Sequence, residues 1–155
     1  MKYISTMLVV KDIEKSKQFY KDVLGLNVVS DFGANVTLEG GIALQTQETW
    51  QDFIKNKNIK YAHHSCELYF EEENMDDFIN HLKNFDIYYI HEPLKHSWQQ
   101  RVVRFYDLDK HIIEVGENMT SVIKRFVDRG MSYQQIAKKM DVPLTYVENC
   151  LEHVN

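Results

Sequence analysis

The sequence predicts an α+β fold made of two β-α-β-β-β modules followed by a helical C-terminal extension. The main observation is an internal repeat: a segment that begins at Val9 has a counterpart that begins at Phe70, and the two align without a gap when Asp12 is placed on Asn74. In each, an apolar strand runs into a residue that suits a helix N-cap, and an acidic first turn and apolar residues at helical spacing follow. An internal repeat of this kind constrains a fold more than any single motif does.

Three short strands are predicted after each of the two helices. After the first helix they cover residues 26–32, 35–39 and 41–46, and after the second they cover 87–91, 101–106 and 111–115. The modules then span residues 1–47 and 62–117, which together form one domain, 1–117. A linker at 48–61 separates them, in which Asn, Lys and Gln surround Trp50.

The extension, residues 118–155, is predicted to hold three short helices at 119–128, 132–140 and 143 or 144 to 153. Ser132 suits an N-cap and Pro143 suits a first helical turn. The stretch from Gly130 to Val147 resembles the helix-turn-helix spacing of DNA-binding proteins, with a small core at Ile136, Ala137, Val142 and Val147.

The charge of the extension argues against nucleic acid as a partner. From Glu117 onward there are five basic and five acidic residues, so the segment lacks the positive surface that phosphate contacts require. We therefore predict that the extension packs, on itself, on the modules or on a partner subunit. The side chains expected to be buried are Ile123, Phe126, Ile136, Val147 and Leu151.

Composition agrees with a small globular binder or enzyme. A hydrophobic fraction of 44% in 155 residues is enough for a core, and the net charge of −5 disfavours a general nucleic-acid binder. No apolar run reaches membrane-spanning length and no leader precedes the first strand, so a cytoplasmic location is the default expectation. Cys66 and Cys150 do not form a disulfide framework and are expected to be buried thiols.

Glu114 is the most informative single residue. The stretch from Arg104 to Glu117 reads as a strand, an acidic turn and a second strand, and alternation places Glu114 on the same face as Ile112. A carboxylate that shares a face with residues that favour burial needs a metal ion, a cationic side chain or a hydrogen-bonded substrate as a partner.

The repeat, the opening segment 7–26 and the closing segment 105–114 resemble the glyoxalase, bleomycin-resistance and extradiol-dioxygenase superfamily, also called the vicinal oxygen chelate superfamily. The resemblance covers about three quarters of the chain. It implies one cup-shaped sheet per module, and an open, barrel-like cavity formed by the two modules. It does not fix the chemistry, because one scaffold serves isomerases, lyases, dioxygenases, thiol transfer and drug sequestration.

The resemblance also implies metal-ligand positions. They correspond to Ser5, to Ala43 or Gln45, to Glu67 and to Glu114 in this chain, and only the two glutamates are good ligands. His63 is a further candidate, because strand alternation would place it with Ser65 and Glu67, and would place His64 and Cys66 on the opposite face. A set of His63, Glu67, Gln45 and Glu114 would suit Zn²⁺, Ni²⁺, Mn²⁺ or Fe²⁺. The alternative is that no metal is used and that the glutamates accept hydrogen bonds from Arg101, Arg104 or tyrosines.

The segment between residues 91 and 104 supplies candidate substrate contacts. Pro93 is expected to end the preceding strand, and the loop that follows carries Trp98 and Gln100 before a strand with Arg101 and Arg104. An indole wall, an amide and a guanidinium fork could together hold a carboxylate or phosphate. The predicted substrate-binding residues are Trp98, Gln100, Arg104, Gln45 and Ser5.

The leading functional hypothesis is a protein that binds a small polar metabolite between its modules and transforms it with a divalent metal, with Glu67 or Glu114 as general base. Whether the chain is an enzyme stays open at this point. The alternatives are metal-free sequestration of a small molecule and, less favoured, a ligand-responsive DNA-binding regulator. The resemblance further implies a homodimer, because open cups of this family complete themselves against another module.

Overall fold

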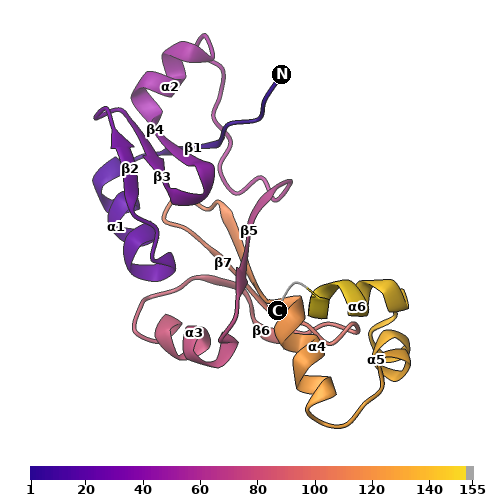
Figure 1. Ribbon diagram of the computed structural model, residues 1–155. Helices are drawn as coiled ribbons and strands as arrows, with labels where there is room; N and C mark the ends of the chain where they lie inside the picture. Colours follow the sequence, from indigo (N-terminus) through magenta and orange to yellow (C-terminus); the bar gives the residue numbers. More distant parts are fainter. Residues whose placement is uncertain (153–155) are drawn as a thin grey trace. The chain divides into compact units, whose positions relative to one another are not determined.

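The structure is a computed structural model that describes residues 1–152. Its elements follow the predicted order, two β-α-β-β-β units and then a helical extension (Figure 1). The strands are β1 Thr6–Val10, β2 Val28–Asp31, β3 Asn35–Leu38, β4 Ile42–Thr46, β5 Glu67–Glu72, β6 Tyr89–Lys95, β7 Arg101–Tyr106 and β8 Ile112–Glu117. The helices are α1 Ile13–Leu24, α2 Gln47–Phe53, α3 Met75–Leu82, α4 Met119–Val127, α5 Tyr133–Met140 and α6 Leu144–Glu152, and a 3-10 turn, η1, covers Glu39–Gly41.

The chain divides into two compact units, each of which is described by itself. The first contains residues 1–68, 85–88 and 106–112, and the second contains 69–84, 89–105 and the residues from 113 onward. Within residues 1–152, no helix has the length and apolar character needed to cross a membrane.

The first sheet has the strand order β1-β4-β3-β2, in which β1 runs parallel to β4 and the other neighbours are antiparallel. Helix α1 begins as predicted, because the side chain of Asp12 accepts a hydrogen bond from the backbone N–H of Lys15, and it ends at Gly25 with a left-handed φ of 71°. The core of this unit consists of fully or nearly fully buried apolar side chains, among them Leu8, Val10, Tyr20, Val36, Leu38 and Leu44.

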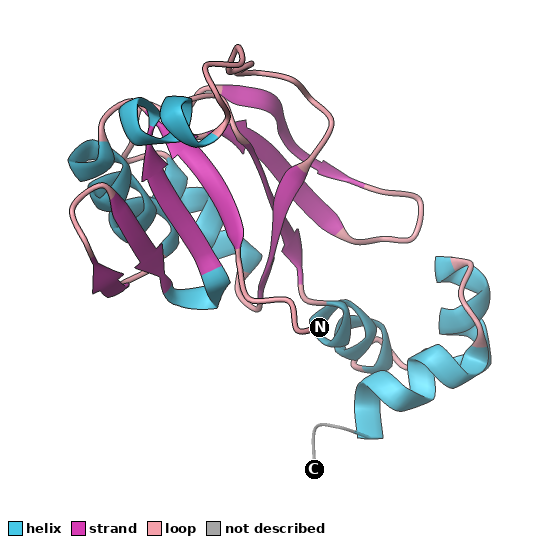
Figure 2. Ribbon diagram, turned by 90° about the horizontal axis from the view of Figure 1, so that it is seen from above, coloured by secondary structure: helices cyan, strands magenta, loops and turns pink. Residues whose placement is uncertain are grey.

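The second sheet has the order β5-β8-β7-β6, which repeats the order of the first sheet strand for strand. Figure 2 draws the strands in magenta. The repeated order confirms the duplicated module, and the predicted strand at 101–106 matches β7 at both ends. The expectation that Pro93 ends a strand is wrong, because β6 continues through Pro93 to Lys95. An edge strand tolerates a residue that cannot donate to the ladder, and here the register shifts between His91 and Leu94.

The extension forms its own hydrophobic cluster from α4, α5 and α6. Ser132 and Gln135 make a capping box at the start of α5, and the left-handed Asp141 (φ 57°) ends that helix. Of the packing alternatives predicted for the extension, the structure shows packing on itself. Ile123, Phe126, Ile136 and Val147 are buried together, whereas Leu151, which was expected to be buried, is partly buried against them. The predicted last residue of the final helix, His153, lies outside the described residues.

Glu117 at the end of β8 holds α4 to the second sheet. Its side chain is only 3% exposed and accepts hydrogen bonds from Arg101 of β7, at 2.9 Å, and from Arg125 of α4. Burial alone would raise the pKa of Glu117, but the two arginines outweigh it and lower the pKa below its ordinary value of 4.5. The ionised form is therefore the one that the folded protein stabilises.

This linkage predicts a pH-dependent stability. Because the folded pKa of Glu117 lies below the unfolded one, its contribution is present above pH 4.5 and is lost as the pH falls through the folded value. We expect Glu117→Gln to lower the free energy of unfolding by about 2–4 kcal/mol at pH 7 and by less at pH 3. Urea unfolding across this range measures the difference, with exposed Glu73→Gln as the matched control. A wild-type advantage that is equal at both pH values would contradict the assignment.

Candidate functional site

A small pocket in the first unit gathers three histidines, and we call it the histidine pocket. Its volume is about 140 Å³. It is lined by Thr6, Leu8, His63, His64, Cys66, Glu67, Leu68, Lys110, His111 and Ile112. The lining therefore comes from β1, from the segment before and at the start of β5, and from the turn that leads into β8.

His111 is held by the carboxylate of Asp107, four residues earlier in the turn between β7 and β8. Its Nδ1 lies 2.8 Å from Asp107 Oδ2, and the same oxygen accepts a hydrogen bond of 2.9 Å from the hydroxyl of Tyr20. The other oxygen, Oδ1, accepts the backbone N–H groups of Asp109 and His111. A carboxylate bound in this way favours a proton on Nδ1, which leaves Nε2 of His111 as an acceptor.

His64 reaches the pocket through an unusual backbone. Ala62 and His64 have φ angles of 53° and 52°, in the left-handed region that non-glycine residues rarely adopt. The Nε2 atom of His64 makes a short hydrogen bond with the hydroxyl of Tyr106. Such backbone strain persists only where the surrounding structure holds it, and it is frequent at functional sites.

The predicted alternation before β5 is wrong. The strand begins only at Glu67, and the left-handed residues interrupt any extended conformation before it, so His63, His64, Cys66 and Glu67 line one pocket instead of opposite faces. His63 Nδ1 lies 2.7 Å from the hydroxyl of Ser65, and its Nε2 lies 3.8 Å from Cys66 Sγ. Cys66 is exposed, which corrects the expectation of a buried thiol, and Cys150 is half-buried.

The donors of this pocket do not form a metal site. Among residues 1–152, no group of three or more His, Cys, Asp or Glu side chains is arranged to hold a metal ion. The assignment of His63, Glu67 and Glu114 as metal ligands therefore stays a prediction, and no chemical step below is derived through a metal.

Glu114 lies in the second unit, on β8, and is 6% exposed. Its Oε2 forms an ion pair with Nη2 of Arg104 on β7, although no described N–H is aligned well enough with that oxygen for a regular hydrogen bond. Nη1 of Arg104 lies 3.2 Å from Nε2 of His91. The buried acid thus has a cationic partner within its own sheet, which was one of the three kinds expected.

The other predicted substrate contacts have partners within the protein. Gln100 is buried, and its amide donates to the hydroxyl of Tyr69 at 3.0 Å and to the backbone oxygen of Glu117 at 2.9 Å. Its carbonyl accepts the indole N–H of Trp98, whose ring stacks on His96 at 4.1 Å. A Cβ at Gly116 would lie 2.9 Å from Gln100 Nε2, so this arrangement depends on a glycine there.

The candidates in the first sheet have different surroundings. Gln45 on β4 is 3% exposed, accepts a hydrogen bond of 2.8 Å from Asn35 and donates to Thr49 at the start of α2. Ser5 is half-buried just before β1. His111, His64 and Lys110 are pocket residues that the sequence interpretation did not select. The Asp107 to His111 spacing was the available signal for His111.

Comparison with known proteins establishes the family. The model of the glyoxalase-like domain matches residues 3–120. The chain belongs to this family, and with it to the glyoxalase, bleomycin-resistance and dioxygenase superfamily. The matched region ends at the start of α4, so most of the helical extension lies beyond it.

Individual relatives agree with this placement. The chain is 29% identical over 108 residues to the metallothiol transferase FosB of Staphylococcus haemolyticus, a match that covers 68% of this chain and 76% of that protein. A protein of unknown function from Agrobacterium tumefaciens is 36% identical, with a TM-score of 0.69 over 76% of this chain and 94% of its own. A lactoylglutathione lyase from Agrobacterium tumefaciens shares the fold at 21% identity, with a TM-score of 0.59 over 76% of this chain and 94% of its own.

The pair of Arg104 and Glu114 can be tested by a double-mutant cycle. We expect Arg104→Met to lower the free energy of unfolding by about 3–5 kcal/mol, because it leaves a buried carboxylate without its cation. Adding Glu114→Leu should restore much of that loss, since an apolar pair of similar volume has no charge to desolvate. Urea unfolding gives both values. Additive losses in the double variant would show that Glu114 does not depend on Arg104.

Proposed function

We propose that this protein binds a small polar molecule in the histidine pocket and that His111 transfers a proton to or from it. The observation that carries the proposal is the Asp107–His111 pair, in which the Nδ1 to Oδ2 distance is 2.8 Å and Asp107 is itself 5% exposed. Imidazole titrates near neutral pH and is the most frequent general acid or base in enzymes. A carboxylate that fixes its tautomer and stabilises its protonated form is a recurring means of activating it.

The pocket limits the size and chemistry of the ligand. A volume of about 140 Å³ holds a molecule of only a few heavy atoms, or the reactive end of a longer one. Leu8, Leu68 and Ile112 supply an apolar wall, while Lys110 and the histidines supply polar groups. This combination suits a small molecule with carbonyl, hydroxyl or acidic oxygens, because convergent polar groups on an apolar wall fix its orientation.

Glu67 is a second candidate base, because its side chain belongs to the same lining. The sequence also predicts Glu67 and Glu114 as catalytic residues and a divalent ion as cofactor, and we keep both as proposals. The name of the FosB relative, a metallothiol transferase, supports metal use in that protein. When bound, such an ion would supply Lewis-acid polarisation of a ligand oxygen. His63, Glu67 and Glu114 stay the ligands that the sequence predicts for this ion, although the described residues show no arranged ligand set.

The tautomer of His111 tests the proposal directly. We expect nitrogen NMR of the imidazole at pH 7.5 to show the proton on Nδ1, because Asp107 accepts it there. A saturation-transfer NMR screen of small α-keto aldehydes, their thiol adducts and phosphonates would identify compounds that bind. For any of these that the protein converts, we expect His111→Asn to lower kcat about 100-fold. His81→Asn on α3 is the matched control.

Three outcomes separate the candidate functions. A proton on Nε2, or an unchanged kcat in His111→Asn, would overturn the role of His111. If Glu67→Gln alone abolishes turnover, Glu67 is the base. If compounds bind tightly but none of them is converted, the metal-free sequestering alternative would be favoured.

We also propose a homodimer, and the edge strand β2 supports this. Val28 and Val29 of β2, at the edge of the β1-β4-β3-β2 sheet, are 42% and 66% exposed, and Phe32, just after β2, is 79% exposed. An unpaired edge with exposed apolar side chains favours pairing with another chain. Sedimentation velocity at protein concentrations of about 5 to about 100 μM, which cover micromolar dissociation constants, should show a dimer. Val29→Asp should shift it to a monomer. A wild-type monomer throughout this range would contradict it.

A further inference from the structure

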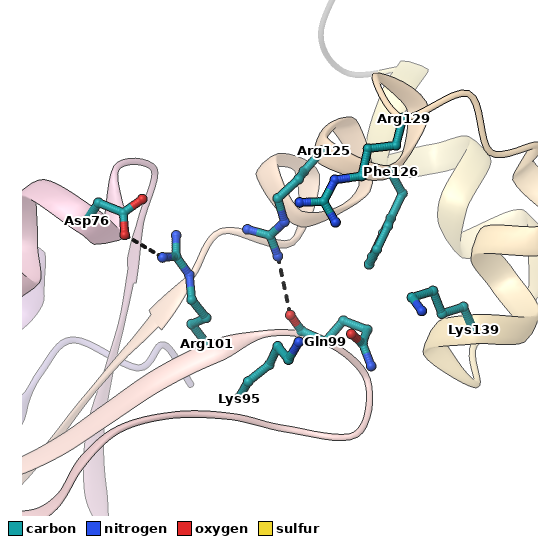
Figure 3. A pocket seen from close by; sticks show the side chains of 8 residues that line it. All are labelled: Asp76, Lys95, Gln99, Arg101, Arg125, Phe126, Arg129 and Lys139. Carbon is teal, nitrogen blue, oxygen red and sulfur yellow. Dashed lines mark hydrogen bonds and ion pairs between the residues drawn. The ribbon is translucent and has the colours of Figure 1, made fainter.

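A basic cleft in the second unit shares no lining residue with the histidine pocket. It has a volume of about 440 Å³ and is lined by Asp76, Lys95, Gln99, Arg101, Arg125, Phe126, Arg129 and Lys139 (Figure 3). Five of these side chains are cationic and one is acidic, on a chain whose net charge is −5. The strands and their loop contribute Lys95, Gln99 and Arg101, whereas the extension contributes Arg125, Arg129 and Lys139.

Two of the five cations are already compensated. Arg101 donates to Asp76 at 2.6 Å and to Glu117 at 2.9 Å, and Arg125 donates to Glu117 and, at 3.4 Å, to the backbone oxygen of Gln99. Lys95, Arg129 and Lys139 have no carboxylate within 4.0 Å among residues 1–152. The ammonium of Lys139 lies over the ring of Phe126, 5.6 Å from its centroid. The cleft therefore carries uncompensated positive charge.

A second observation points to a missing acceptor. The Nε–H of Arg101 is buried and has no hydrogen-bond partner among residues 1–152. A buried donor without an acceptor destabilises the fold, so such groups usually have a partner in the working protein. Since Arg101 itself lines the cleft, an anion bound there could accept from it and face the three uncompensated cations.

We propose that this cleft binds a phosphate-bearing small molecule. Guanidinium groups that converge with lysines favour an anion with several oxygens and more than one negative charge, and phosphate offers both. The volume falls in the range of small-molecule sites, about 300–1,000 Å³, which exceeds what inorganic phosphate alone would fill. Duplex DNA fits less well, because α6, the second helix of the helix-turn-helix-like pair, has Glu148 and Glu152 and no Lys or Arg from Leu144 to Glu152.

The experiment is a titration of the full-length protein with pyrophosphate at low ionic strength, monitored by calorimetry and by the Nε–H resonances of arginine side chains. We expect saturable binding, a shift of the Arg101 Nε–H signal, and about a 10-fold loss of affinity in Lys139→Glu and in Arg129→Glu. Lys138→Glu is the matched control: Lys138 is also exposed on α5 but does not line the cleft, so its replacement should change affinity less than about 2-fold.

Circular dichroism first establishes that each variant is folded. Each remaining outcome decides the proposal. Equal losses of pyrophosphate affinity in Lys138→Glu and Lys139→Glu, or an unchanged Arg101 Nε–H signal, would mean that the binding is general surface attraction. Either result would overturn the proposal. Tighter binding of citrate than of pyrophosphate would replace phosphate by carboxylate as the ligand class. Retardation of a DNA duplex that depends on Lys139, without pyrophosphate binding, would assign the surface to nucleic acid. None of these results depends on His111, so failure here is separable from failure of the proposed proton transfer.

Discussion

The carboxylate of Asp107 is the group on which the first unit and its pocket depend. It is 5% exposed, and a buried carboxylate is tolerated only where hydrogen bonds replace its water. Four donors do so: two backbone N–H groups of its own turn, the ring of His111 and the hydroxyl of Tyr20, which lies 87 positions earlier in the chain. Burial, and then the charge of Asp107, raise the pKa of Tyr20 well above its ordinary value of 10.0, so the hydroxyl keeps its proton. The turn, the helix α1 and the orientation of His111 are therefore fixed by one group.

Most of the fold could be predicted because its signals are local. The caps at Asp12, Asn74 and Ser132 each accept the backbone hydrogen bond expected of them, and the strand order repeats between the sheets as the internal repeat requires. Pro93 shows where local reasoning ends. Proline is excluded from a strand with two neighbours but not from an edge, and only the order β5-β8-β7-β6 shows that β6 is an edge.

The candidate site was less predictable, because its contacts join residues that are distant in sequence or conformationally unusual. Glu114 was correctly expected to be buried and partnered, but periodicity could not select Arg104 from the cations available. Glutamine is a residue type suited to ligand contact, yet the amide N–H groups of Gln100 donate hydrogen bonds to Tyr69 and to the backbone oxygen of Glu117. His63 and His64 were assigned to opposite faces by a period-two rule that holds only for extended backbone, and the left-handed φ angles of Ala62 and His64 break it.

The extension shows how charge placement separates two uses of one helical pattern. Its spacing resembles that of a helix-turn-helix DNA-binding protein. Its basic side chains, however, lie elsewhere: Arg125 is on α4, Arg129 follows α4, and Lys139 is on α5. They line the basic cleft and not the surface of α6. Arg125 also bonds Glu117, which in turn holds Arg101. An anion in the cleft would act on the same two guanidinium groups that attach α4 to the second sheet. Because a ligand that binds only the folded form stabilises it by mass action, occupancy of the cleft and retention of the extension would then be thermodynamically linked.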